Sequence, residues 1–149
     1  MENINTNDII DQMEGILASH EAVECPLTHS FVPGFYIREV FMPAGTFLTS
    51  KIHKTEHPFY VSEGKVSVWI DGKVQVIEAP YWGMTKPGTR RVLFIQKNCR
   101  WATFHANPDN CKDVIEIENR IIEAHDNPLL SEEIKLKNNL NQKICPSLE

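Results

Sequence analysis

The sequence predicts a mainly β protein in which a barrel or sandwich of short strands has one helix at each end. Between about residues 25 and 107, alternating apolar segments recur at intervals of roughly 8–12 residues, which is typical of antiparallel barrels and sandwiches. Proline and glycine turn signals separate these segments. The flanking segments instead carry apolar residues at helical spacing. The 149 residues suffice for one domain with its own core.

The expected organisation is an N-terminal helical segment over residues 1–24, a β-barrel over 25–108, and a C-terminal helix with a loose tail over 109–149 that packs on the barrel. Asn7 is a plausible cap for the first helix. The apolar positions at helical spacing are Ile9, Ile10, Met13, Ile16 and Leu17 in the first helix and Val114, Ile117, Ile121 and Ile122 in the second.

About eight strands are expected, including segments 35–42, 46–53, 65–70, 73–77, 90–95 and 100–105 and one that begins at His57. Glu63-Gly64 and Lys97-Asn98 are read as turns. Asp71-Gly72 is a strong signal for a two-residue hairpin. Both faces of that hairpin are apolar, so one should line the barrel and the other should meet a helix or a second subunit. This pattern predicts a homodimer.

Composition excludes several functional classes. A net charge of −5 and a pI near 5.7 give no basic surface for nucleic acid or for an anionic membrane. No apolar run reaches the roughly 18 residues of a membrane span, and the N-terminus lacks the features of a signal peptide, so a cytoplasmic protein is expected. The four cysteines (Cys25, Cys99, Cys111 and Cys145) form no Cys-x-x-Cys pair, which favours free thiols over disulfides or structural zinc.

The stretch from Lys51 to Gly64 carries two histidines four residues apart, His53 and His57. Pro58 and the β-rich residues after it argue against a helix. We therefore expect one strand to end near His53, a tight turn, and a second strand to begin at His57. Facing strands would place both rings on the same side of a sheet.

These residues resemble the motifs of the cupin superfamily. Gly45, His53, Val61 and Gly64 fall into the frame of the first cupin motif, Gly72 ends the hairpin beyond it, and Pro87-Gly88 takes the place of the turn in the second motif. The match covers about residues 34–107. It implies a jelly-roll barrel, also called a double-stranded β-helix. The pattern is also similar to small cupin-like proteins of tailed phages and bacteria.

The chain departs from the cupin ligand set at several positions. Lys51 and Arg91 stand where the family has histidines, and His57 stands where it has a glutamate. His105 offers a replacement if Trp101, Thr103 and His105 all point inward by strand alternation. The resemblance then implies a metal site of His53, His57 and His105. Three imidazoles suit a divalent transition metal such as Zn, Fe, Ni, Mn or Cu.

Arg91, Lys51 and Trp101 are the candidate ligand-binding residues. A guanidinium inside the barrel binds either an anion, such as a carboxylate or phosphate, or a structural partner such as Glu56 or Glu63. Lys51 either orients an anion or extends to solvent. The tryptophans fit a core or an interface better than a nucleic-acid platform. Arg90 is expected to face solvent, and His29 and His125 to be structural.

Two functions from different classes follow. In the first, a metal-binding cupin-like barrel takes a small anionic molecule at the three-histidine site, with the reaction, if any, left open. In the second, the barrel is a non-catalytic module without metal, with a structural, phage accessory or ligand-binding role. Near-stoichiometric metal would separate the two.

Overall fold

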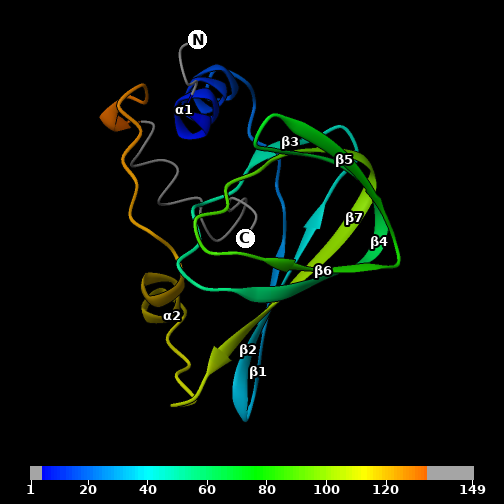
Figure 1. The fold of residues 1–149 in the computed structure, drawn as a ribbon, viewed down its shortest axis with the longest axis vertical. Helices are drawn as coiled ribbons and strands as arrows, with labels where there is room; N and C mark the ends of the chain where they lie inside the picture. The colour runs from blue at the N-terminus through cyan, green and yellow to red at the C-terminus, as the bar shows by residue number, and fades with distance from the viewer. Residues whose placement is uncertain (1–4, 134–149) are drawn as a thin grey trace.

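The computed structural model describes residues 5–133. Its elements follow the order helix, seven strands, helix (Figure 1). Their bounds are α1 Thr6–Leu17, β1 Leu27–Val32, β2 Gly34–Met42, β3 Phe47–Thr49, β4 His57–Ile70, β5 Lys73–Glu78, β6 Tyr81–Thr85, β7 Val92–Asn107 and α2 Val114–Ile121. The predicted mainly β architecture with one helix before and one after the strands is confirmed.

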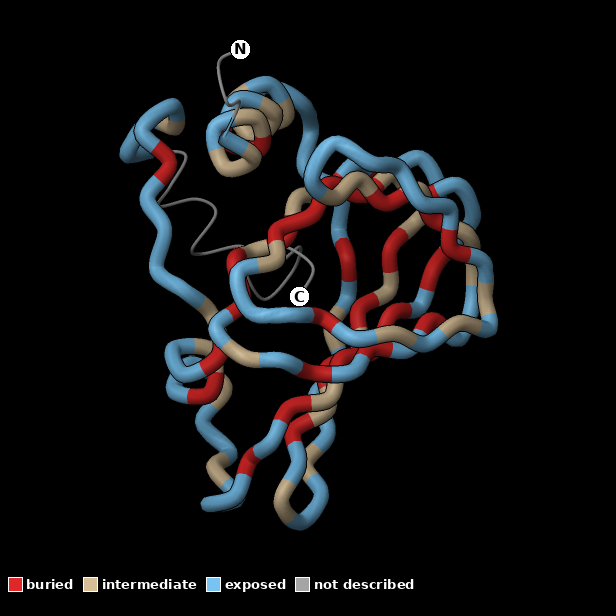
Figure 2. The backbone as a smooth tube through the Cα atoms, viewed as in Figure 1, coloured by how far each residue is buried: buried red, intermediate tan, exposed pale blue. Residues whose placement is uncertain are grey.

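Two long antiparallel strands, β4 and β7, organise the barrel. The first half of β4 pairs with β6 and its second half with β5. Likewise, β7 pairs with β3 through its first half and with β2 through its second, while β1 pairs with the outer edge of β2. All seven strands belong to one sheet, in which each long strand changes its outer neighbour halfway along, and the strands curve around a common interior (Figure 1). In Figure 2, buried residues recur at intervals along the strands of the barrel.

The bend in β4 and β7 replaces two expected turns. Register shifts run from Val61 to Val66, so the strand continues through Glu63-Gly64 as an irregular, bulged segment. Gly64 has a φ of +101°, and a Cβ there would lie 2.3 Å from the carbonyl oxygen of Asn98. Only glycine allows the two strands to approach this closely. The predicted turns at Glu63-Gly64 and Lys97-Asn98 are wrong, because the turn-forming residues serve a bend within continuous strands.

The structure confirms the predicted hairpin but differs from the predicted strands near both ends of the barrel. Asp71-Gly72 forms the predicted two-residue hairpin, with Ile70 opposite Lys73. The strand expected over 46–53 is reduced to Phe47–Thr49, because the chain leaves β7 there to approach α2. A strand at Leu27–Val32 was not predicted.

The barrel core is a continuous apolar cluster enclosed by the curved sheet. Val66 and Val68 point into it from the predicted hairpin. Val74 and Val76, on the other face, are 67% and 53% exposed. Thus one face lines the interior as expected, and within residues 5–133 no helix covers the other.

Helix α2 closes one side of the barrel near His53. Asp113 caps it, with its carboxylate accepting from the amides of Ile115 and Glu116. Ile117 and Ile121 are buried in a second cluster with Tyr36. Backbone hydrogen bonds from Lys54 to Ile121 and from Glu123 to Ile52, both 2.8 Å, join the end of the helix to the chain around His53. Residues 134–149, where the tail was predicted, lie outside the described part of the chain.

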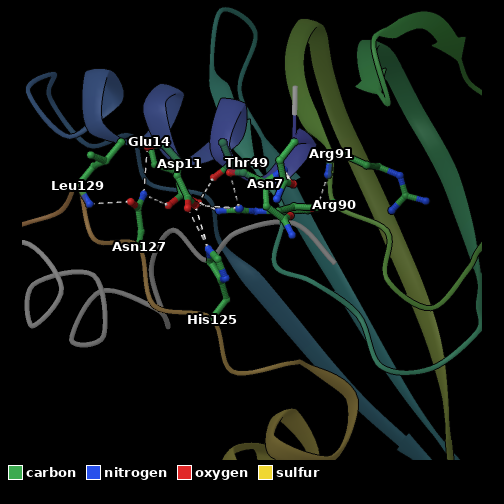
Figure 3. A network of polar contacts seen from close by, with 11 residues as sticks. Asn7, Asp11, Glu14, Thr49, Arg90, Arg91, His125, Asn127 and Leu129 are labelled. Atoms are coloured by element: carbon green, nitrogen blue, oxygen red, sulfur yellow. Dashed lines mark hydrogen bonds and ion pairs between the residues drawn. The ribbon is translucent and has the colours of Figure 1, made fainter. Parts of the chain in front are cut away.

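A buried polar network holds α1 (Figure 3). Arg90 was expected to face solvent, but it is 4% exposed and donates to Asp11 and Glu14 of α1, each at 2.8 Å. The prediction failed because α1 covers this outer side of the barrel. The cap of α1 is Asn5, not Asn7, since the Asn5 side chain accepts from the Asn7 amide.

The same carboxylates bind the segment after α2. His125 Nε2 lies 3.0 and 3.1 Å from the two oxygens of Asp11, so this histidine is structural, as predicted. Asn127 donates to the Asp11 carbonyl and to Glu14. Asp11 thereby connects three segments that are far apart in the sequence.

Two further findings concern membranes and thiols. No helix within residues 5–133 is long and apolar enough to cross a membrane. Cys99 and Cys111 are free thiols, in line with expectation, while Cys145 lies outside the described residues. Burial, with a contribution from Glu63, raises the pKa of the Cys99 thiol to about 12.

Replacing Asp11 should detach α1 from the barrel. Asp11→Ala leaves the buried Arg90 guanidinium with Glu14 as its one remaining carboxylate among residues 5–133, besides the Asn7 carbonyl, and breaking a buried pair costs about 3–5 kcal/mol. We expect a loss of about that size in the free energy of unfolding measured by urea titration. Asp8→Ala, in the first turn of the same helix but exposed, should cost less than about 1 kcal/mol. Equal losses in the two variants would contradict this role of Asp11.

Candidate functional site

The site begins with two histidines on neighbouring strands. Phe59 on β4 lies opposite Thr103 on β7, so the same register places His57 opposite His105. Their ring centroids are 4.4 Å apart. On the far side of β7, His105 is paired with Tyr36 of β2, whose ring stacks on it at 5.8 Å. Strand alternation therefore turns both imidazoles inward, as the sequence predicted.

His53 joins this pair from outside the long strands. It forms an isolated bridge with Ile122, and its carbonyl accepts from the Gly88 amide at 2.8 Å. Its ring centroid is 4.8 Å from that of His57. All three histidines are at most 2% exposed. The structure thus brings together the three histidines that the sequence singled out.

Backbone carbonyls define the tautomers of two rings. His57 Nδ1 lies 3.1 Å from the Thr55 carbonyl oxygen, and His53 Nδ1 lies 3.4 Å from that of Thr89. A carbonyl oxygen can only accept, so Nδ1 carries the proton in each neutral ring and Nε2 carries the lone pair. Metal-binding histidines commonly have this arrangement, in which the second nitrogen donates to a carbonyl.

The third ring is oriented differently. His105 Nε2 is 2.9 Å from Thr103 Oγ1, a hydroxyl that can donate or accept. Within residues 5–133 no three His, Cys, Asp or Glu side chains place their donor atoms around a common metal position. The donor set suits a transition metal chemically, but His105 would have to meet it through Nδ1 or after reorientation. Metal binding here remains a prediction.

Arg91 reaches the residue that pairs with His57 across the sheet. Its Nη2 donates to Thr85 Oγ1 at 2.9 Å, and Thr85 is the β6 partner of His57. The guanidinium carbon is 5.4 Å from the Phe59 ring centroid and 6.0 Å from that of Trp101. The Arg91 amide also donates to Ser50 Oγ at 2.7 Å, which fixes the backbone from which the side chain extends.

Arg91 is a buried cation, with 4% of the residue exposed, and within residues 5–133 it lacks the carboxylate partner that a buried charge normally has. No carboxylate within residues 5–133 pairs with it: Glu63 pairs with Arg100 at 3.0 Å, and Glu56 is exposed. The structural ion pair considered from the sequence is therefore not formed. Burial lowers the pKa of Arg91 from 12.5 to about 10, so folding disfavours the charged form. The group nevertheless remains a cation at neutral pH, and that cost to stability persists until pH rises above about 10.

The Trp101 ring lies beside the Arg91 guanidinium. It is fully buried and stacks on Phe59 with centroids 4.5 Å apart and an interplanar angle of 11°. A Cβ on Gly83 would lie 2.8 Å from the Phe59 ring, so this glycine leaves the room that the ring occupies. Trp101 therefore belongs to the core, and a role toward a ligand stays a prediction.

Lys51 is half-buried, two residues before His53. Sequence reasoning missed Thr85 and Ser50, the two hydroxyl residues that position Arg91. Both lie on segments whose partners are distant in the chain. Only the pairing of β4 with β6 and the approach of Ser50 to Arg91 reveal their roles.

The tautomer assignment is directly testable. Because a carbonyl faces Nδ1 of His57, long-range ¹H–¹⁵N spectra of the labelled protein should show a protonated Nδ1 and an unprotonated Nε2 for the neutral ring of this residue. The signal is assigned by its loss in His57→Gln. A protonated Nε2 with an unprotonated Nδ1 would contradict the assignment.

Comparison with known proteins supports the fold. No protein-family model and no curated protein matches the chain. Among solved structures, salicylate 1,2-dioxygenase from Pseudoaminobacter salicylatoxidans aligns over 80% of this chain at 16% identity and a TM-score of 0.53. Two others are DMSP lyase DddQ from Ruegeria pomeroyi, at 11% identity over 56% of the chain with a TM-score of 0.49, and an RmlC-like cupin from Shewanella frigidimarina, at 14% over 64% with 0.48.

The chain spans 34% of the dioxygenase, 47% of the lyase and 86% of the RmlC-like cupin. At these identities the likeness concerns the fold alone. It agrees with the observed strand pairing, in which two long bent strands pair with each other and each changes its outer neighbour halfway along one antiparallel sheet. The chain forms a jelly-roll β-barrel with a helix before it and a helix after it, the fold that the cupin-like motifs of the sequence predicted.

Proposed function

We propose that this protein binds a small anion inside its cupin barrel, at Arg91, beside a three-histidine site for a divalent transition metal. The observation that carries the proposal is a guanidinium buried to 4% exposure that donates to the Thr85 hydroxyl, lies over two aromatic rings and has no carboxylate partner within residues 5–133. A buried charge is strongly unfavourable until an opposite charge compensates it. A bound anion would supply that charge.

The histidines support the metal component. His53 and His57 each direct Nδ1 at a carbonyl, which makes Nε2 the coordinating nitrogen, and His105 completes a set of three imidazoles. A divalent transition metal bound there would act as a Lewis acid toward an oxygen of the anion. Arg91 would hold that anion next to His57, through the Thr85 contact that orients the guanidinium.

A metal-free ligand-binding barrel is the second candidate. It is favoured by the lack of a ready donor arrangement within residues 5–133 and by the contact that engages His105 Nε2. In this version the histidines would serve as neutral hydrogen-bonding groups around the anion. Both candidates need Arg91, and they differ only in whether metal is required.

Anion binding is expected to depend on Arg91. At an anion concentration 100 times the dissociation constant, binding stabilises the native state by about 2.7 kcal/mol, which raises the Tm by roughly 5–10 °C in a chain of this size. We expect such a rise for wild type with at least one of acetate, phosphate and sulfate at constant ionic strength. Arg91→Met should lose it, whereas Arg100→Met, at an exposed salt bridge, should keep it.

Metal content of the same preparations, made without chelator or nickel affinity, separates the two candidates. Near-stoichiometric metal by ICP-MS in wild type and in His20→Ala, with loss in His57→Ala and His105→Ala, would support the metal site; His20 is an exposed control at the end of α1. Anion binding without metal would favour the second candidate. Circular dichroism must show that the variants are folded. No Tm rise with any of the three anions would contradict both.

The outer face of β4, β5 and β6 exposes apolar side chains that a second copy of the chain could cover. Trp82 is 70% exposed, and Val74 and Val76 lie on the same hairpin surface that prompted the homodimer prediction. We propose that a second copy of this chain covers the face, since exposed apolar patches commonly mark interfaces. Light scattering should give twice the monomer mass of 17.1 kDa, and Trp82→Glu should shift the protein toward monomer. A monomeric wild type at tens of micromolar, an order-of-magnitude choice of concentration, would contradict the homodimer.

A further inference from the structure

Thr103 determines which nitrogen of His105 is held by the protein. The two residues are two positions apart on β7, so their side chains lie on the same face of the sheet, toward the interior. Thr103 Oγ1 is 2.9 Å from His105 Nε2. Both residues are at most 2% exposed, so bulk water does not compete for this contact.

The hydroxyl of Thr103 needs an acceptor for its hydrogen, because buried polar groups are nearly always hydrogen-bonded. Among residues 5–133, His105 Nε2 is the one hydrogen-bond partner of this hydroxyl. The residues opposite Thr103 in the sheet, Arg38 on β2 and Phe59 on β4, carry no side-chain acceptor. The hydroxyl therefore donates to Nε2, and in the neutral ring of His105 the proton is on Nδ1.

The ring of His105 is held in this orientation from both sides. It lies between the ring of Tyr36 on β2, at 5.8 Å and an interplanar angle of 27°, and the ring of His57 on β4, at 4.4 Å. Tyr36 is itself fully buried, and its hydroxyl contacts Nδ1 of His29 on β1. A half-turn of the His105 ring would place a carbon against the Thr103 hydroxyl and lose the hydrogen bond. Nε2 of His105 is therefore kept toward Thr103.

In His53 and His57 the protein holds the opposite nitrogen. Nδ1 of each ring faces a backbone carbonyl oxygen, that of Thr89 for His53 and that of Thr55 for His57. The nitrogen that faces a protein oxygen is the second nitrogen of a metal-binding imidazole, so Nε2 coordinates in these two rings. The same reasoning assigns Nδ1 to His105, because its Nε2 is the nitrogen that a protein oxygen holds.

We infer that Thr103 is a positioning residue of the site and that His105 acts through Nδ1, unlike His53 and His57. The inference rests on the proposed function and adds to it the acting nitrogen of His105. Toward an anion alone, Nδ1–H of His105 is a donor. Toward a metal, His105 coordinates through Nδ1 and carries its proton on Nε2, where the Thr103 hydroxyl turns to accept it. The ring gains at Nε2 the proton that it loses at Nδ1, so its charge does not change.

Long-range ¹H–¹⁵N spectra of the labelled full chain test this assignment. Without metal, the neutral ring of His105 should have a protonated Nδ1 and an unprotonated Nε2. Zinc chloride should reverse this pattern in His105 and leave Nδ1 of His57 protonated, so His57 is an internal control. The signals of His105 are assigned by their loss in His105→Gln. A protonated Nε2 in the metal-free protein would overturn the inference.

Substitutions at Thr103 distinguish positioning from packing. Thr103→Val keeps the shape of the side chain but removes the hydroxyl, and it should weaken zinc binding by about tenfold or more, as measured by competition with a chromophoric chelator. The metal-free spectrum of this variant should show both tautomers of His105. Thr103→Ser restores the hydroxyl and should restore both properties, whereas Thr46→Val, at another buried threonine, should change neither. A folded Thr103→Val with the wild-type tautomer of His105 would overturn the positioning role.

The remaining outcomes separate this inference from the proposed function. Zinc that binds through Nε2 of all three histidines would support the metal site and overturn the assignment of Nδ1 to His105. Failure of wild type to bind zinc would contradict the metal component of the proposed function. The metal-free spectra of wild type and Thr103→Val would then decide the inference by themselves.

Discussion

The pairing of β4 with β7 is the constraint on which the rest of this molecule depends. Along this one ladder, the half beyond the bend builds the apolar core with Val66, Val68, Leu93 and Ile95. The other half sets His57, Phe59 and Val61 against His105, Thr103 and Trp101. A slip of one residue would turn every one of these side chains outward, because strand side chains alternate with a period of two. Core and site therefore share one register, which Gly64 allows by admitting the close approach to Asn98.

The two helices are attached to the barrel by different interactions. Helix α2 packs its isoleucines on Tyr36 and joins the His53 segment through backbone hydrogen bonds, so it supports the histidine side of the interior. Helix α1 instead docks through Arg90, whose guanidinium has two carboxylate partners. The adjacent Arg91 points the other way and has none among residues 5–133. Two consecutive buried arginines thus differ in their partners: Arg90 is paired with two carboxylates, and Arg91 has no carboxylate partner among residues 5–133. This difference is the reason for proposing a ligand at Arg91.

The cupin fold accommodates this interior without fixing its chemistry. The strand arrangement is similar to that of a salicylate 1,2-dioxygenase that is only 16% identical in sequence. A shared fold at that distance supports no shared activity. The function of this chain has to be sought in its own substitutions, above all arginine and lysine at positions where the superfamily motif has histidine. These replace neutral ligands with cations and so favour an anion close to the histidines.

The sequence by itself determined the β class, the two helices, the Asp71-Gly72 hairpin and the candidate residues His53, His57, His105 and Arg91, because alternation, turn chemistry and motif spacing are local properties. It could not show that Glu63-Gly64 bends a strand instead of ending it, since turns and bulges use the same residues. Only the tertiary structure placed Thr85 and Ser50 against Arg91 and Asp11 against Arg90. Those contacts join segments up to 79 residues apart, and long-range pairing depends on the register and packing of the whole barrel, which no local pattern encodes.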